Sequence, residues 1–323
     1  MNEQPLRNLG FDLIRATEAA ALAAGQWMGL GKPEEADEAA AAAMYEVLNT
    51  IDIDAGVVIG EQGKLHQCEL VQTGAHAGTG AGPRVDIVPD AIDGRALLAQ
   101  GYPGAISVVA AAPCGSFWAP VPAHYMDKMV VGATVGPALV PECLDAPAAW
   151  TLALVARAEG KNVSDLVVFV LDRPRHADLV AEIRAAGART MLRDEGDIAG
   201  ALMAVLVDGG VDILMGIGGV AEGLIAACAV KASGGAMLGR LAPQSARERS
   251  EVEAAGLDMH RILSVDELVT SDELFFVATG ITDGPLLSGV AYHGSLATSN
   301  SMILRGQTRT RRVIRAEHRL ERG

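Results

Sequence analysis

The fold of this 323-residue chain is decided by the stretch from Val211 to Gly223, which reads VDILMGIGGVAEG. It begins with a short aliphatic run, typical of a buried strand, and ends in residues that favour a helix. The glycine turn Gly216–Gly219 joins the two parts. A strand that leads through glycines into a helix is the repeating element of α/β proteins, so this stretch predicts that class of fold.

The same alternation continues on the N-terminal side of the glycine turn, as far as Pro141. Helices are expected at Ala146–Glu159, Ala177–Ala186 and Gly196–Val207, with strands at Leu166–Leu171 and Thr190–Leu192 between them. After a helix at Ala221–Ala232 the strand pattern returns, at Leu274–Thr279, Val290–Tyr292, Ser301–Leu304 and Thr308–Ala316. Strands alternating with helices predict a parallel or mixed sheet.

The residues before Pro141 show a different order of expected elements, with two helices followed by several strands. Two helices are expected: an amphipathic one at Leu6–Met28, which glycines follow, and an Ala-rich one at Pro33–Leu48, which has acids in its first turns. Short apolar strands are expected at Val57–Ile59, Val85–Val88, Ile106–Ala112 and Met129–Val135. This change in the pattern of expected elements predicts two parts, an N-terminal α/β half of residues 1–145 and a C-terminal α/β half of residues 146–323.

A second stretch, from Asp86 to Arg95, carries the chemistry of the N-terminal half and reads DIVPDAIDGR. A short strand runs into a turn with two carboxylates, Asp90 and Asp93, at a sheet edge, where loops commonly hold functional residues. Two acids held close repel each other unless a cation lies between them, which indicates a hard-metal site with oxygen ligands. A solvated Asp-Gly turn would explain the same residues, and only partners elsewhere in the chain can decide.

Further acids stand near the ends of expected elements. Glu61 follows the strand at Val57–Ile59. Asp37 lies near the start of the second helix, where the helix dipole alone would favour it. Glu222 follows the glycine turn, whose backbone N–H groups can bind a phosphate. A cation bridging Glu222 to that phosphate would explain a carboxylate at this place.

Three more polar groups are candidates for substrate binding. Arg173, Pro174 and Arg175 follow a strand and offer two guanidinium groups suited to phosphate, although a charged loop explains them equally well. The acidic turn Glu195-Gly196-Asp197 can accept hydrogen bonds from sugar hydroxyls, or its last residue can cap the next helix. Tyr125 precedes a strand, within Tyr125-Met126-Asp127-Lys128.

Composition limits the possible partners. With 26 Lys and Arg against 40 Asp and Glu, the formal net charge is −14, which disfavours nonspecific binding to nucleic acid and to anionic membranes. The C-terminal arginines are better explained by a terminal strand with a charged edge. The four cysteines have neither zinc-site nor disulfide spacing, the N-terminus lacks a secretion signal, and no window makes a good membrane span. We therefore expect a cytoplasmic protein.

Several motifs of the chain occur together, in the same order, in one known family. They are Arg7-Asn8-Leu9 with Thr17-Glu18-Ala19-Ala20, Ala36-Asp37, Val58-Ile59-Gly60-Glu61, Ile92-Asp93-Gly94, Tyr125-Met126-Asp127-Lys128, Arg173-Pro174-Arg175-His176, Gly216-Ile217-Gly218-Gly219 with Glu222-Gly223, and Ala278-Thr279-Gly280-Ile281-Thr282. Over nearly its whole length the chain resembles the class II (GlpX-type) fructose-1,6-bisphosphatases, members of the lithium-sensitive, metal-dependent sugar phosphatases.

The resemblance implies a layered α/β sugar-phosphatase fold of the fructose-1,6-bisphosphatase and inositol monophosphatase type, assembled as a homodimer or homotetramer. It implies hydrolysis of the 1-phosphate of fructose 1,6-bisphosphate or of a related sugar bisphosphate such as sedoheptulose 1,7-bisphosphate. Mg²⁺ or Mn²⁺ would be held by Asp37, Glu61, Asp90, Asp93 and Glu222, and Asp37, Glu61 and Arg95 would act in catalysis. The sugar phosphate would be contacted by Asp93, Gly94, Arg95, Tyr125, Arg173, Pro174, Arg175, Glu195, Gly196, Asp197 and Gly219.

Two departures from the family pattern concern the reaction itself. Arg95 stands where the family has a threonine that helps to orient the attacking water, and a guanidinium has only donors. It can instead grip a phosphate or partly replace a metal. After Glu61 the family's acidic run is replaced by Gln62-Gly63-Lys64-Leu65-His66. Loss of a positioned water activator typically costs about 10²–10⁴ in rate, so the alternative is a weakened pseudophosphatase that binds a sugar phosphate as a regulatory or pathway-specific protein.

Overall fold

The computed structural model describes residues 9–60, 72–206 and 209–320, and the chain divides into two compact units. Unit 1 is discontinuous and consists of residues 1–117 together with residues 271–323. Unit 2 is the continuous segment 118–270. The two ends of this segment are tied together, because the N–H of Trp118 donates to the carbonyl of Leu268 at 2.9 Å.

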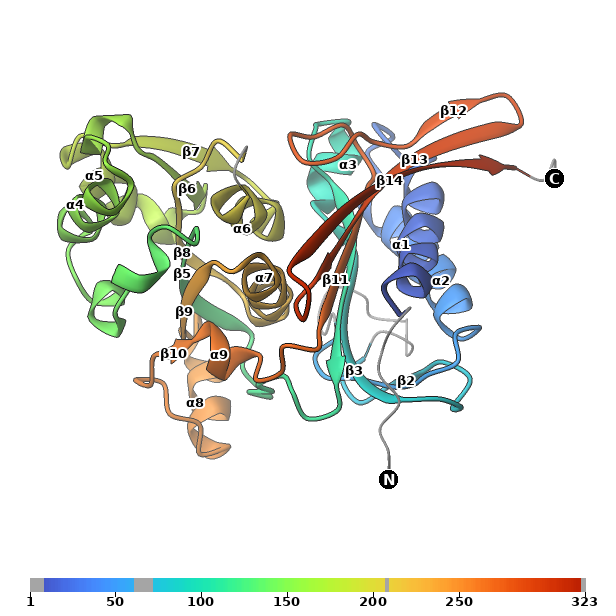
Figure 1. Ribbon diagram of the computed structural model, residues 1–323, viewed down its shortest axis with the longest axis horizontal. Helices are drawn as coiled ribbons and strands as arrows, with labels where there is room; N and C mark the ends of the chain where they lie inside the picture. The colour runs from blue at the N-terminus through green and yellow to red at the C-terminus, as the bar shows by residue number, and fades with distance from the viewer. Residues whose placement is uncertain (1–8, 61–71, 207–208, 321–323) are drawn as a thin grey trace. The chain divides into compact units, whose positions relative to one another are not determined.

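Unit 1 is built around a mixed sheet with two long helices on one face (Figure 1). Its described helices are α1 (Leu9–Gly25), α2 (Pro33–Leu48) and α3 (Arg95–Gln100), and its described strands are β1 (Asp54–Val57), β2 (His76–Ala77), β3 (Arg84–Asp93), β4 (Ile106–Pro113), β11 (Phe275–Gly280), β12 (Ala291–His293), β13 (Leu296–Arg305) and β14 (Thr310–Arg319). The strand order is β12-β13-β11-β4-β3-β1-β2, with β14 paired to β13. Only β1 and β3 pair in parallel among these strands.

Small and aliphatic residues bring α1 and α2 close to each other and to the sheet. The buried positions recur every three or four residues, which puts them on one face of each helix. They are Leu9, Leu13, Ala16, Ala20 and Ala24 in α1, and Ala36, Ala40, Met44 and Leu48 in α2. Both helices therefore correspond to helices expected from the sequence.

A chain of buried hydroxyl groups joins α1 to the middle of the sheet. Thr17 Oγ1 lies 2.8 Å from Thr279 Oγ1 on β11, which lies 2.9 Å from Ser301 Oγ on β13. All three side chains are buried, and a buried hydroxyl is costly unless it is hydrogen-bonded. Two motifs behind the family resemblance, around Thr17 and around Thr279, thus have a structural role.

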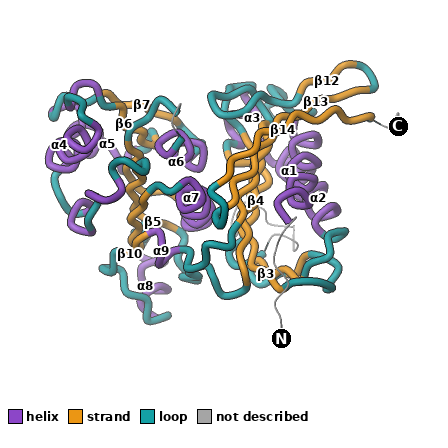
Figure 2. The backbone as a smooth tube through the Cα atoms, viewed as in Figure 1, coloured by secondary structure: helices purple, strands orange, loops and turns teal. Residues whose placement is uncertain are grey.

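Unit 2 is a three-layer arrangement, with a sheet between helices (Figure 2). Its described helices are α4 (Ala148–Glu159), α5 (Ala177–Ala185), α6 (Asp197–Val205), α7 (Val220–Ser233), α8 (Ala246–Ala254) and α9 (Val265–Leu268), with short 3₁₀ turns η2 (Gly136–Ala138), η3 (Pro141–Leu144), η4 (Val163–Asp165) and η5 (Pro174–His176), and its strands are β5 (Tyr125–Val131), β6 (Val167–Leu171), β7 (Arg189–Arg193), β8 (Ile213–Gly219), β9 (Ala236–Leu241) and β10 (Leu263–Ser264). The strand order is β10-β9-β5-β8-β6-β7. Helices α4 and α5 cover one face, and α6 and α7 cover the other.

The α/β class predicted from the sequence is confirmed, but the chain is divided differently along its length. The boundary expected between residues 145 and 146 lies inside unit 2. The reason is long-range pairing: β11, from the C-terminal part of the chain, pairs with β4 from Phe275↔Ala111 to Gly280↔Ile106. The C-terminal strands thereby complete the sheet of unit 1.

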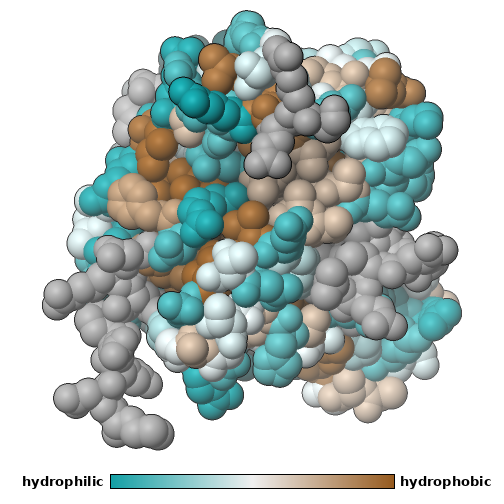
Figure 3. Space-filling view, turned by 90° about the vertical axis from the view of Figure 1, so that its right-hand side faces the viewer, coloured by the Kyte–Doolittle hydropathy of each residue, from teal (hydrophilic) through white to brown (hydrophobic). Residues whose placement is uncertain are grey.

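The surface of the described residues is mixed in character. On the face seen in Figure 3, hydrophobic residues reach the surface in several places between hydrophilic ones. Four of the C-terminal arginines, Arg311, Arg312, Arg315 and Arg319, lie on β14, which pairs only with β13 among the described strands. In the part of the chain that the structure describes, no helix combines the length and hydropathy that crossing a bilayer requires. Cys143 and Cys228 are buried, and Cys114 is exposed.

Candidate active site

The two aspartates at the end of β3 lie on a strand rather than in the expected turn. β4 continues to pair with β3 beyond Asp90, which lies opposite Val108, while Asp93 lies opposite Ile106. Between these two pairs β3 advances by three residues and β4 by only two. The extra residue in β3 makes a β-bulge, which bends a strand locally. Within it the N–H of Ile92 donates to Asp90 Oδ1 at 3.2 Å. Both carboxylates are buried, so a solvated Asp-Gly turn does not describe this place.

Asp37 and Arg95 form an ion pair in unit 1. Arg95 is the first residue of α3 and follows Gly94, whose φ of 98° suits glycine. Its Nη1 donates to Asp37 Oδ2 at 2.9 Å, with the Asp37 side chain fully buried and the Arg95 side chain 27% exposed. The helix dipole explains the first-turn acids Glu34 and Glu35 of α2, but Asp37 lies beyond that turn and faces a cation.

Glu61 lies outside the described residues, as does the altered sequence that follows it. The structure describes the chain up to Gly60, whose N–H donates to Thr73 Oγ1 at 3.1 Å. Two residues earlier, the N–H of Val58 donates to the carbonyl of Ile87 on β3 at 3.0 Å. The predicted roles of Glu61 therefore stay predictions.

In unit 2, the expected glycine turn Gly216–Gly219 is the end of β8, and we call it the glycine segment. It pairs with β5, from Lys128↔Gly216 to Tyr125↔Gly219. Glycines are needed because neighbouring side chains fill the space where Cβ atoms would lie: a Cβ on Gly219 would overlap the carboxylate of Glu222, in the first turn of α7. The two predicted site residues Gly219 and Glu222 are therefore in contact.

Arg175 lies against the same glycine segment. Its Nε and Nη2 donate to the carbonyl oxygen of Ile217 at 3.2 and 2.8 Å. Its guanidinium carbon lies 5.4 Å from the ring centroid of Tyr125, a cation–π geometry. The other arginine of the loop, Arg173, has its Nη2 4.0 Å from Glu195 Oε1. Arg175 and Tyr125, which are far apart in the sequence and were both predicted to bind substrate, thus lie at the end of β8, and Arg173 lies near Glu195.

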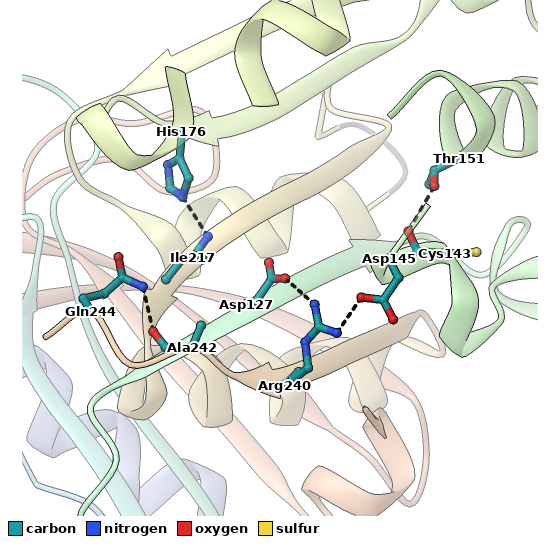
Figure 4. Close-up of polar contacts among 9 residues, drawn as sticks. All are labelled: Asp127, Cys143, Asp145, Thr151, His176, Ile217, Arg240, Ala242 and Gln244. Atoms are coloured by element: carbon teal, nitrogen blue, oxygen red, sulfur yellow. Dashed lines mark hydrogen bonds and ion pairs between the residues drawn. The ribbon is translucent and has the colours of Figure 1, made fainter. Parts of the chain in front are cut away.

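His176 was part of a quoted motif, but the sequence assigned it no role. Its Nδ1 lies 2.7 Å from the carbonyl oxygen of Leu171, and its Nε2 accepts from the N–H of Ile217 at 2.8 Å (Figure 4). Because Nε2 is an acceptor, the hydrogen-bond network assigns the single ring proton to Nδ1, which donates to Leu171. With Arg175 on its carbonyl and His176 on its N–H, Ile217 is held from both sides.

We expect His176 to make the stability of the protein depend on pH. Burial lowers the pKa of this imidazole below its ordinary value of 6.5; Arg175 and Lys128 act in the same direction, and the Leu171 carbonyl and Asp197 act against it. The neutral, buried imidazole therefore contributes its full stabilisation to the folded protein above pH 6.5. This contribution is lost as the pH falls through the lower pKa of the folded state, because the imidazole then becomes charged. From about pH 7 to pH 5, the free energy of unfolding in urea should decrease more steeply for wild type than for His176→Asn. Parallel pH profiles of the two proteins would contradict this role.

Lys128 is a second residue whose role the sequence did not reveal. Its side chain is fully buried and forms an ion pair with Asp197, the first residue of α6. A Cβ on Gly218 would overlap both the Asp197 carboxylate and the Lys128 Nζ. The N-cap position of α6 is occupied by Gly196 rather than by Asp197, and no side chain among the described residues caps this helix start.

Glu248 fixes the backbone in front of β5. Its Oε1 accepts from the N–H groups of His124 and Tyr125 at 2.8 and 3.0 Å, and its Oε2 accepts from the N–H of Gln244 at 2.8 Å. The carboxylate is buried, at the start of α8. No local pattern announces this contact, because Glu248 is more than a hundred residues away from the tyrosine that it positions.

Asp127 and Arg240 form a polar group on neighbouring strands (Figure 4). Arg240 Nη2 lies 3.4 Å from Asp127 Oδ2, and its Nη1 donates to Asp145 Oδ1 at 2.5 Å. Burial raises the pKa of Asp127, and Arg240 opposes that shift. This cluster explains why Asp127 belongs to the Tyr125–Lys128 motif.

The predicted metal ligands are only partly assembled among the described residues. Asp90 and Asp93 share the bulge, Asp37 pairs with Arg95, and Glu222 lies beside Gly219. Within residues 9–60, 72–206 and 209–320, no group of three His, Cys, Asp or Glu side chains is arranged to hold a metal ion. The donor chemistry at the bulge nevertheless fits a hard cation, because it consists of buried carboxylate oxygens.

Comparison with known proteins identifies the family. The model of the glpX-encoded bacterial fructose-1,6-bisphosphatases matches residues 7–318. A fructose-1,6-bisphosphatase class 2 of Haemophilus influenzae is 40% identical, over 98% of this chain and 97% of the relative. A fructose-1,6-bisphosphatase 1 class 2 of Escherichia coli K12 is 36% identical, over 98% of this chain and 96% of the relative. The chain therefore belongs to the family of glpX-encoded bacterial fructose-1,6-bisphosphatases.

Proposed function

We propose that this protein is a metal-dependent phosphoric monoester hydrolase that removes the 1-phosphate of fructose 1,6-bisphosphate. Family membership along nearly the whole chain supports the activity, and so do the names of the two relatives. The observation that carries the proposal is the pair of buried carboxylates, Asp90 and Asp93, at the bulge that ends β3. Such acids are rarely buried unless a positive group compensates them.

Mg²⁺ or Mn²⁺ is the cofactor that this donor set suits. Both prefer carboxylate oxygens, and Asp90 and Asp93 would hold the cation, with Glu61 and Glu222 as further proposed ligands. When bound, the cation would supply positive charge to the phosphoryl oxygens and lower the pKa of a coordinated water. Burial of the carboxylates keeps their negative charge directed at such a cation rather than screened by solvent.

The residues around the glycine segment suit the binding of a sugar phosphate. Arg175 is oriented by Ile217 and Tyr125, and oriented guanidinium groups bind phosphate well. N–H groups at the start of α7 add a favourable helix terminus. The remaining proposed substrate contacts are Asp93, Gly94, Arg95, Arg173, Pro174, Glu195, Gly196, Asp197 and Gly219.

A substrate panel tests the proposal. Release of inorganic phosphate is measured with Mg²⁺ or Mn²⁺ from fructose 1,6-bisphosphate, sedoheptulose 1,7-bisphosphate and fructose 6-phosphate. We expect the largest kcat/KM for fructose 1,6-bisphosphate and little release from the monophosphate. Calorimetric binding of these sugars without phosphate release would favour the pseudophosphatase instead. A cytoplasmic homodimer or homotetramer is also part of the proposal, and sedimentation of the purified protein tests the assembly.

A further inference from the structure

The Arg95–Asp37 pair places a permanent positive charge at a carboxylate expected to bind a metal. The Asp37 side chain has no exposed surface, and the Arg95 guanidinium lies 2.9 Å from it. Burial of a carboxylate is costly unless a cation compensates it. An arginine remains protonated at all physiological pH values, so it provides that compensation without any bound ion.

The fold holds this guanidinium in place from several directions. Arg95 begins α3 directly after the bulge residue Asp93 and the left-handed Gly94. At the other end of α3, the carbonyl oxygens of Leu98 and Ala99 accept from the N–H groups of Gly29 and Gly31, both at 2.9 Å. These glycines lie in the connection between α1 and α2. Helix α3 is therefore tied to the chain that leads into α2, the helix that carries Asp37.

We propose that Arg95 is a built-in cation that takes the place of a divalent metal at Asp37. The proposal rests on the proposed function for its other metal ligands, Asp90 and Asp93, which keep their role. The guanidinium takes up a carboxylate oxygen that a divalent ion would otherwise coordinate, and its positive charge repels such an ion. The protein consequently binds fewer metal ions than its predicted ligand set would allow, and Arg95 acts on Asp37 as a positioning residue.

The number of Mn²⁺ ions bound per chain tests this inference without any measurement of activity. The full-length protein is stripped with chelator, dialysed against Mn²⁺, and analysed for metal by mass spectrometry. Arg95→Met is expected to bind one more Mn²⁺ per chain than wild type, because the neutral side chain frees Asp37 for a metal. Arg95→Lys keeps the charge and is expected to bind the same number as wild type.

Two further variants assign the extra ion to Asp37. Asp37→Asn in the wild-type background is expected to leave the Mn²⁺ number unchanged, because Arg95 already occupies that carboxylate. The same change in Arg95→Met is expected to remove the additional ion. Arg95→Thr serves as a second neutral variant if Arg95→Met does not fold, as judged by circular dichroism.

The outcomes separate this inference from the proposed function. An unchanged Mn²⁺ number in folded Arg95→Met or Arg95→Thr would overturn it, and so would loss of a bound ion in Asp37→Asn. If the neutral variants gain one ion while wild type releases no phosphate from fructose 1,6-bisphosphate, the inference holds and the proposed function fails. If wild type hydrolyses the sugar but the neutral variants gain no ion, the function holds and the inference fails.

Discussion

Replacing Lys128 by methionine should lower the free energy of unfolding by about 3–5 kcal/mol, because removing one partner of a buried ion pair leaves the other charge uncompensated. The Lys128 side chain is fully buried and that of Asp197 is 9% exposed. Gly218 packs directly against both groups, with no room for even a methyl group. Solvent therefore cannot easily reach Asp197 to replace the lost ammonium group.

Urea unfolding of the full-length protein at pH 7.5 measures this effect. Lys161→Met is the matched control: Lys161 also pairs with acids, Glu159 and Asp212, but its side chain is 43% exposed, so a loss below about 1 kcal/mol is expected. Adding Asp197→Asn to Lys128→Met should recover much of the lost stability, because the buried charge disappears. A Lys128→Met protein as stable as wild type would show that this ion pair does not stabilise unit 2.

Replacing Asp90 by asparagine should reduce the release of phosphate from fructose 1,6-bisphosphate by about 10²-fold or more. Asparagine keeps the size of the side chain but removes a negative charge that the proposed cation requires. A bound metal contributes several kcal/mol of transition-state stabilisation, and about 1.4 kcal/mol corresponds to a factor of ten in rate. The effect should appear in kcat/KM at saturating Mg²⁺ and Mn²⁺.

Asp86→Asn on the same strand is the matched control for Asp90→Asn. The Asp86 carboxylate accepts from the N–H of Gly115 at 2.6 Å, and Asp86 belongs to none of the proposed ligand sets. We expect this variant to retain its activity, with a small loss of stability. If Asp90→Asn is folded and stays within a few-fold of wild type, the carboxylates at the bulge are not metal ligands.

The elements that sequence predicted well are those with a strong local period. α2 begins and ends at Pro33 and Leu48, as expected, because Pro33 favours a helix start and because Ala36, Ala40, Met44 and Leu48 recur every four residues. Short elements were missed: α3 has only six residues, too few for a periodic signal. β9 was missed as well, because its glycine and arginine do not suggest a strand.

Features that depend on pairing between strands far apart in the sequence could not be predicted from local sequence patterns. The bulge at Asp90 and Asp93 exists because β4 continues to pair past it, and a turn and a strand end have similar local sequences. The discontinuity of unit 1 follows from the pairing of β11 with β4. One sequence contains no direct record of such contacts, whereas the family resemblance supplied the overall layout.

The residues of the candidate site also fall into two groups, those that the sequence predicted and those that only the structure shows. Charged residues at element ends, such as Asp90, Arg175 and Glu222, were visible as candidates. The supporting contacts of Lys128 and His176 were not, because each depends on a partner at least forty residues away along the chain. Arg95 was recognised as unusual, but only the structure shows its contact with Asp37.

The formation of fructose 6-phosphate from fructose 1,6-bisphosphate is the most direct measurement of the central claim, that this protein is a metal-dependent bisphosphatase. The purified full-length protein is assayed by following fructose 6-phosphate and inorganic phosphate together, first after chelation and then after the return of Mg²⁺ or Mn²⁺. The account predicts equal amounts of both products, no turnover without the cation, and full recovery when it is restored. Equal turnover with and without the cation, or no fructose 6-phosphate under either condition, would contradict it.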